Sequence, residues 1–199
     1  MKCPSCRTTV TPPAERCPSC KFALRKADAK FGRPPWHSRY LTDRTGRLLL
    51  SEMPKLRGEL ALFEKKFPQS LFSVFITELS PGASVTEYAF WLANRGRFSS
   101  IEAVGSANFD LLLVIDAVAG TAAFTVGYGL EKYLQEGDLE DILTAGAPAF
   151  REGDLAGGIL ICIDRTVQRM REISPQTKRE NESEKSDDTA TAAKAQSSA

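Results

Sequence analysis

Two neighbouring runs of strand-forming residues, at 110–116 and 121–127, constrain the fold of this chain more than any other feature. The first reads DLLLVID, and a continuous apolar run of this length predicts a strand buried on both faces. The second reads TAAFTVG and follows a turn at Ala119-Gly120, which predicts a hairpin. A strand covered on both faces needs helices on both sides of its sheet, so a layered α/β fold is expected.

Two helices and one further strand are predicted before this hairpin. An apolar stripe predicts a helix over 51–67, which Ser51 would cap and Pro68 would end. Residues 72–77 read FSVFIT and predict a strand that is apolar on both faces. The capping box at Ser84–Glu87 begins the next predicted helix.

Two more helices are predicted after the hairpin. Asp138 would cap the first, which Gly146 and Pro148 would interrupt. Asp154 would cap the second, whose apolar stripe covers 155–173. The order helix, strand, helix, strand, strand, helix, helix predicts an α/β domain with a mixed sheet.

A glycine-flanked tyrosine follows the second strand of the hairpin. Gly127 and Gly129 bracket Tyr128, so the backbone there is free to take a positive φ or to approach another segment. Glu131 then enters a short helix, where unpaired N–H groups favour a carboxylate. The turn is either a binding loop or a plain connection from strand to helix.

Four of the five cysteines form two CPSC pairs near the N-terminus. Cys3 and Cys6 are separated by ten residues from Cys17 and Cys20, and each CxxC turn presents two sulfurs on one side. We therefore predict a structural zinc bound by all four. The alternatives are two disulfides or a redox-active pair. Cys162 lies on an apolar helical stripe and is expected to belong to the core.

The chain divides by composition into four parts. Residues 1–24 form the predicted zinc ribbon, and 25–39 are a basic, proline-containing linker with few regularly spaced apolar residues. The α/β domain covers 40–173, and 174–199 lack large apolar residues, which predicts a disordered tail. His37, the only histidine, is expected to be exposed or to cap a helix.

Composition gives no indication of a charged partner or of a membrane. The 199 residues include 26 basic and 25 acidic side chains, for a net charge of +1, so no overall field favours nucleic acid. The N-terminus has no apolar signal-peptide core, and the longest apolar run, 111–126, is interrupted by Asp116. A soluble, cytoplasmic protein without a membrane span is expected.

Three segments give the chain a family resemblance. VGYGLEKYL at 126–134, LTDRTGRLL at 41–49 and FREGDLAGGI at 150–159 resemble the TPM domain, over roughly 40–173. The resemblance implies a three-layer α/β/α sandwich. It also implies acid phosphatase activity and calcium binding, both of which have been connected with the family, in a shallow acidic cleft at one sheet edge.

The same resemblance nominates site residues. Asp43 and Glu131 stand in its motifs and are the candidate catalytic residues, and Asn108 and Asp110 precede the central strand. Because Asp110 and the end of the hairpin lie at the same end of the sheet, these four residues are expected to form one open patch for calcium or magnesium. Phe109 replaces a small residue of the family pattern, which leaves fewer oxygen ligands than the six to eight that calcium takes.

Two functions follow from these features. The first is a binding or scaffold module whose zinc ribbon contacts a partner protein. It would not read nucleic acid specifically, because Phe22 is the only aromatic residue near the cysteines. The alternative is a divalent-metal-dependent phosphatase that hydrolyses phosphate esters at the acidic cleft.

Overall fold

The computed structural model of the chain describes residues 2–11, 14–98 and 109–173. Asn108 and the predicted tail at 174–199 lie outside these ranges. Among the described residues, no helix has the length and the apolar composition needed to cross a membrane.

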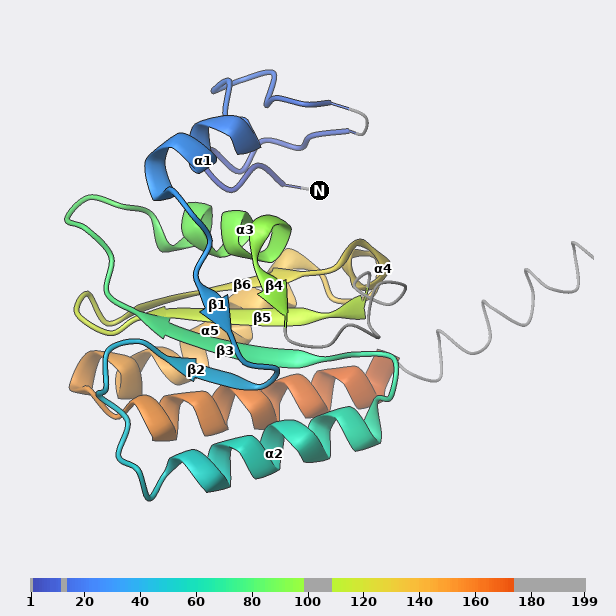
Figure 1. Cartoon of the computed structure of the whole chain (residues 1–199). Coiled ribbons are helices and arrows are strands. Elements are labelled where there is room, and N and C mark those ends of the chain that lie inside the picture. The colour runs from blue at the N-terminus through green and yellow to red at the C-terminus, as the bar shows by residue number, and fades with distance from the viewer. Residues whose placement is uncertain (1, 12–13, 99–108, 174–199) are drawn as a thin grey trace, which may run out of the picture.

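A mixed four-stranded sheet forms the centre of the molecule, in the order β2-β3-β5-β6 (Figure 1). Parallel pairing joins β2 (Leu41–Asp43) to β3 (Phe72–Thr77), and β3 to β5 (Leu111–Asp116). The last strand, β6 (Thr121–Val126), pairs antiparallel with β5, and Leu111 faces Val126. The predicted hairpin and mixed sheet are confirmed.

The larger core lies on the face of the sheet that three helices cover. These are α2 (Met53–Lys66), α5 (Glu136–Glu152) and a last helix over 155–173. Alternate side chains of the strands point into this core because side chains of a strand alternate between faces. The buried set includes Phe72, Val74 and Ile76 from β3 and Leu111, Leu113 and Ile115 from β5.

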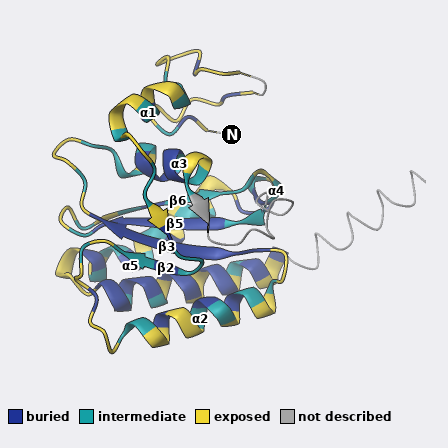
Figure 2. Ribbon diagram, in the orientation of Figure 1, coloured by how far each residue is buried: buried dark blue, intermediate teal, exposed yellow. Residues whose placement is uncertain are grey.

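The opposite face of the sheet is covered by α3 (Val85–Arg95) and, outside it, by α1 (Leu24–Phe31). Phe75 and Val114 point to this side and pack against buried residues of α3 such as Trp91. Helices therefore cover both faces, and the predicted three-layer α/β/α sandwich is confirmed (Figure 1). Figure 2 shows β3 and β5 buried along their length, whereas β6 is only partly so.

The first part of the segment predicted to be a linker forms α1, which packs on the outer side of α3. Ala27 of α1 is buried, and the ring of Phe31 packs against Trp91 at 5.3 Å between centroids. The carboxylate of Asp28 accepts the indole N–H of Trp91 at 3.1 Å and two hydrogen bonds from Arg95. Hydrogen bonding to Arg95 is the main reason that the pKa of Asp28 lies below its usual value.

The chain after α1 adds a short extension beside the main sheet. Residues Trp36–His37 (β1) pair in parallel with Arg97–Phe98 (β4). The exposure expected for His37 is wrong, since its ring is buried against Phe75. Burial lowers its pKa, although the Ser38 carbonyl opposes the effect. Trp36, in contrast, is 68% exposed.

Helix ends agree with the sequence in some places and differ in others. Ser84 accepts the Glu87 N–H at 3.3 Å, and Asp154 accepts the Gly157 N–H at 2.8 Å, as predicted. Ser51 is not an N-cap, because α2 begins at Met53 after Glu52.

Helix α5 continues through Pro148, which was expected to interrupt it. Pro148 removes the N–H that would bond the carbonyl of Thr144. Both residues lie exposed, so this carbonyl faces water, and the helix continues to a left-handed Gly153 with φ 82°.

Candidate functional site

The two CPSC segments fold as matching knuckles. The Cys3 N–H donates to the Thr8 carbonyl at 2.9 Å, and the Cys17 N–H donates to the Phe22 carbonyl at 2.8 Å. The backbone carbonyl of Cys3 accepts the Arg7 N–H at 2.9 Å, and that of Cys17 accepts the Lys21 N–H at 3.1 Å. The equal spacing in the sequence thus becomes an equal geometry, which points both pairs of sulfurs inward.

The four sulfurs meet in a cluster of the size that zinc requires. Cys3 Sγ lies 3.6 Å from Cys20 Sγ, Cys6 Sγ lies 3.6 Å from Cys17 Sγ, and all four atoms fall within 4.8 Å of one another. Tetrahedral Zn–S bonds of about 2.3 Å place sulfurs roughly 3.8 Å apart, whereas a disulfide needs about 2.05 Å. The four cysteines therefore fit a zinc ribbon.

Cys3 and Cys6 lie in environments that shift their pKa values in opposite directions. Burial raises the pKa of Cys3 to about 12, while hydrogen bonding with the Thr8 hydroxyl and backbone lowers that of Cys6 to about 6. Four adjacent thiolates repel one another, so the set needs a cation among the sulfurs in order to ionise together.

The residue after each knuckle adopts a backbone conformation that side chains rarely take. Arg7 has φ 58° and Lys21 has φ 61°, and they are the non-glycine residues with positive φ in the described part of the chain. The left-handed conformation costs each of them about 1 kcal/mol. The closed knuckle, and a metal within it, would offset this cost.

The ribbon is attached to the α/β domain through side-chain contacts. Phe22 packs against Cys3, Val10 and Cys17 in a small cluster, and its ring meets Phe90 of α3 at 5.9 Å in a T-shaped pair. These contacts place the ribbon over α3, on the side away from the sheet (Figure 1).

Asp43, a candidate catalytic residue, holds a turn. Its carboxylate accepts hydrogen bonds from the Thr45 N–H at 2.8 Å and hydroxyl at 2.7 Å, from the Gly46 N–H at 3.1 Å, and from the Leu48 N–H at 3.0 Å. Burial alone would raise the pKa of Asp43, but these bonds outweigh it, and the pKa lies below the usual 3.8. The four donors occupy both carboxylate oxygens.

Replacing Asp43 tests its role in this turn. Replacing Asp43 with asparagine keeps an oxygen for Thr45 and Gly46 but puts an amide N–H₂ group opposite the Leu48 N–H, so we expect a loss of about 1–3 kcal/mol in the free energy of unfolding. Since the folded-state pKa is depressed, the carboxylate stabilises the fold fully above pH 3.8 and stops doing so as the pH falls through the folded pKa. The variant should therefore lose less stability than the wild type on acidification below pH 3.8.

Denaturant unfolding at several pH values measures both effects. Asp116→Asn is the matched control, because Asp116 uses one oxygen, Oδ1, for the Val118 and Ala119 N–H groups, which asparagine retains. An Asp43→Asn variant as stable as the wild type near neutral pH would contradict the structural role of Asp43.

Asp110 lies at the opposite end of the strands from Asp43. As predicted from the hairpin, Asp110 and Gly127 are neighbours, and the Gly127 N–H donates to the Asp110 carbonyl at 2.8 Å. The side chain of Asp110 accepts the Leu71 N–H at 3.1 Å. Burial raises its pKa, in part opposed by that hydrogen bond and by Arg39.

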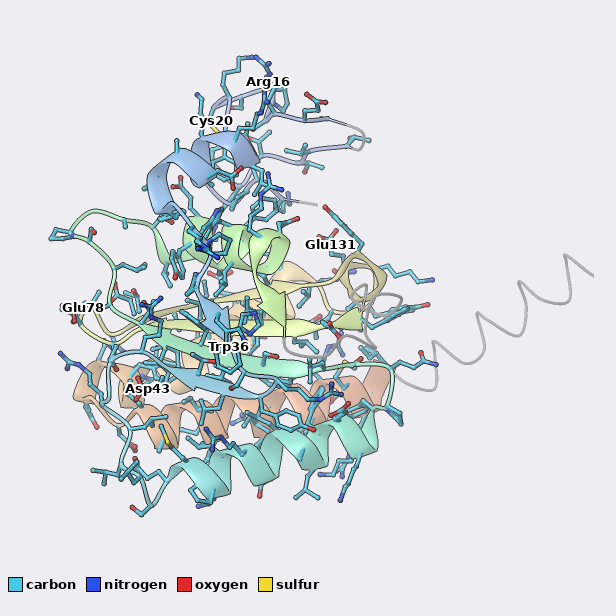
Figure 3. All side chains as sticks on the ribbon, in the orientation of Figure 1. Arg16, Cys20, Trp36, Asp43, Glu78 and Glu131 are labelled. Carbon is cyan, nitrogen blue, oxygen red and sulfur yellow. The ribbon has the colours of Figure 1, made fainter. Side chains whose placement is uncertain are left out.

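The expected patch of four oxygen-bearing residues does not form as predicted. Asp43 pairs with Ile76 of β3, and Ile76 pairs with Ile115 of β5. Ile115 lies five residues after Asp110, which is roughly 17 Å along an extended strand. Figure 3 shows Asp43 and Glu131 at opposite ends of the sheet. Asp110 and Glu131 line the same groove, while Asn108 lies outside the described residues.

A calcium or magnesium centre is therefore not supported by the geometry. In the described ranges, the group of three or more His, Cys, Asp or Glu side chains close enough to share a metal is the cysteine cluster. The glycines beside Tyr128 do not take positive φ either, since Gly127 has φ −68° and Gly129 lies within α4 (Tyr128–Glu131).

A groove along the outer edge of β6 was not foreseen from the sequence. It has a volume of about 1180 Å³ and is lined by residues of the ribbon, α3, β6, α4 and α5. Its parts are far apart in the sequence. In the described part of the chain, β6 pairs with β5 alone, and this follows from the sheet order and not from the sequence.

Comparisons with known proteins agree with this fold. The TPM domain matches residues 41–169, well over half of the chain. The N-terminal domain of a protein from P. gingivalis shares 25% identity, with a TM-score of 0.51 over 66% of this chain and 82% of that one. The BA42 protein of Bizionia argentinensis shares 12% identity, with a TM-score of 0.54 over 65% and 86% of the two chains. No match was found among curated proteins.

Proposed function

Because this chain belongs to the TPM domain family, we propose that it is a TPM domain with a zinc-binding ribbon that acts by binding a partner protein. The observation that carries the proposal is the attachment of the ribbon to α3. Phe22 of the ribbon and Asp28 and Phe31 of α1 all contact α3. The ribbon, α1 and the α/β domain would therefore present one continuous surface.

The charge of the ribbon and of the start of α1 supports a partner with acidic character. Within residues 2–26 there are six basic side chains and one acidic side chain, Glu15. Even with a charge of −2 on a zinc tetrathiolate, this surface stays positive. Every one of the basic residues lies exposed: Lys2, Arg7, Arg16, Lys21, Arg25 and Lys26.

The carboxylates nominated for catalysis have structural partners. Asp43 fixes the turn at residues 44–48, and Asp110 accepts the backbone N–H of Leu71, the residue before β3. These roles account for both residues without a reaction. The phosphatase alternative rests on the resemblance to the TPM domain and on the groove that Asp110 and Glu131 share, where the raised pKa of Asp110 suits a general acid.

Hydrolysis of p-nitrophenyl phosphate decides between the two functions. We expect the purified full-length protein to give no turnover above buffer with calcium, magnesium or manganese added, and Glu131→Ala to behave identically. A metal-dependent rate that falls in Glu131→Ala would establish the phosphatase and overturn the non-catalytic proposal.

Cross-linking tests the binding role directly. A photo-reactive residue at position 16, on the exposed ribbon surface (Figure 3), should give a discrete cross-linked product in cells. The same group at position 65, exposed on α2 across the sheet, should not. Equal products at both positions, or none at position 16, would contradict a role for the ribbon.

A further inference from the structure

The strand β6 forms an edge of the sheet and its own sequence lacks the features that usually protect such an edge. Among the described residues the sheet order ends at β6, so one side of it has no strand neighbour. Proteins commonly protect an edge with proline, charged side chains or a bulge. The sequence of β6, TAAFTV, has no proline or charge, and its pairing with β5 is regular.

The direction of the backbone groups of β6 follows from one hydrogen bond. Gly127 donates to Asp110, its direct partner in the register. Hydrogen-bonded and non-hydrogen-bonded pairs alternate along an antiparallel ladder. The N–H and C=O groups of Ala122, Phe124 and Val126 therefore point away from β5. In the part of the chain that the structure describes, none of the three has a hydrogen-bond partner on that side.

The layers above and below extend past this edge. On one side of the groove lie Lys2 and Arg7 of the ribbon. On the other lie Leu139 and Leu143 of α5, which are partly buried against the larger core, together with the acidic Glu136 and Glu140 of the same helix. The layers on both faces of the sheet therefore extend past β6.

We propose that the edge of β6 accepts an extended segment of a partner protein as a fifth strand. Side chains of a strand alternate between faces, so the segment would place apolar residues toward Leu139 and Leu143 and acidic residues toward Lys2 and Arg7. Backbone hydrogen bonds would provide affinity, and the two walls would provide specificity. This inference rests on the proposed binding function and assigns it a location.

A second copy of the chain fits the edge less well than a slim peptide. Pairing of β6 with β6 of another copy would bring the ribbon and α5 of both molecules to the same narrow space. The ribbon and α5 already approach each other across the groove, where Arg7 Nε lies 3.7 Å from Glu136 Oε1. A single extended segment needs no room for a second pair of walls.

Residue-resolved amide exchange with a synthetic peptide tests the proposal. The probe is acetyl-TVDVEVTV-amide, which alternates apolar with acidic or polar side chains, added to zinc-loaded full-length protein. We expect exchange at Ala122, Phe124 and Val126 to slow about tenfold or more, with no change at Thr121, Ala123 and Thr125, which face β5. Protection absent from the first three, or spread over both sets, would overturn the proposal. Protection without peptide that grows with protein concentration would identify a second copy as the occupant and overturn it as well.

Two controls isolate the backbone contact. A probe methylated on alternate backbone nitrogens keeps its side chains, and we expect it to give no protection. Ala122→Pro removes an outward N–H at an edge position, where proline is tolerated, and should weaken binding of the probe about fivefold to tenfold. Ala123→Pro removes an N–H that faces β5 and should instead destabilise the sheet. If Ala122→Pro does not fold, the methylated probe still decides the question. Loss of this site with cross-linking at position 16 retained would leave the proposed function in place.

Discussion

Replacing Cys17 with serine is expected to remove zinc from the protein and to unfold the ribbon. The ribbon's own core consists of little more than Cys3, Val10 and Cys17 against Phe22, too few residues to fold alone. Apparent free energies for structural zinc are roughly 10–16 kcal/mol, so losing one ligand removes most of what holds the knuckles. Elemental analysis should give one zinc per wild-type chain and none for the variant.

The loss should also reach the α/β domain, but only in part. Unfolding the ribbon withdraws Phe22 from Phe90 and loosens α1 over α3. The larger core on the other face of the sheet includes no residue before Tyr40. We therefore expect the domain to unfold cooperatively at a lower temperature than in the wild type. Simultaneous loss of all structure would show that the two parts fold as one unit.

Cys162→Ala is the matched control for the zinc measurement. Cys162 is fully buried in the helix over 155–173, and burial raises its pKa to about 12. The thiol is therefore a core group, as predicted, and its removal should leave one zinc per chain. A zinc content that falls in Cys162→Ala but not in Cys17→Ser would refute the assignment of the ligands.

Replacing Gly158 with alanine is expected to destabilise the α/β domain strongly, because the added methyl group meets a buried ring. A Cβ atom at Gly158 would lie 2.3 Å from Cε1 and 2.5 Å from Cδ1 of Phe150. Phe150 is buried in the larger core, so its ring cannot move aside freely. Overpacking of this kind costs about 1–3 kcal/mol or more, which for a chain of this size lowers Tm by roughly 3–10 °C.

Gly58→Ala provides the comparison in a helix without the contact. Gly58 lies inside α2, and a Cβ there has no neighbour within 4 Å. The same substitution should therefore stabilise the protein by about 1 kcal/mol through helix propensity. The double variant Gly158→Ala with Phe150→Leu should recover part of the loss, because the clashing ring is gone. Equal Tm changes for Gly58→Ala and Gly158→Ala would show that α5 and the helix over 155–173 do not meet as described.

Some features of this protein could be predicted because they depend on neighbours in the sequence. The apolar run at 111–116 and the turn at Ala119-Gly120 identify the hairpin. The spacing of the CPSC pairs identifies the sulfur cluster. In both cases the residues that must meet are joined by a short chain, so little loop entropy opposes the contact.

The helix over residues 24–31 could have been found but was missed. Leu24, Ala27 and Phe31 recur at helical spacing, but the basic residues around them and the two prolines that follow indicated a linker. Its partner, Trp91, lies about sixty residues away in the sequence, and the burial that makes α1 stable exists only once α3 is in place.

The layered α/β class, the mixed sheet and the sulfur cluster could be predicted from the sequence, because hydrophobic period, turn chemistry and ligand spacing are local properties. The end of the sheet that each carboxylate occupies is evident only in the folded chain. Asp43 is the last residue of the three-residue strand β2, and the parallel pairing of β2 with β3 places Asp43 at the opposite end of the sheet from Asp110. The edge position of β6 is likewise evident only in the folded chain, because it depends on where every other strand and helix packs.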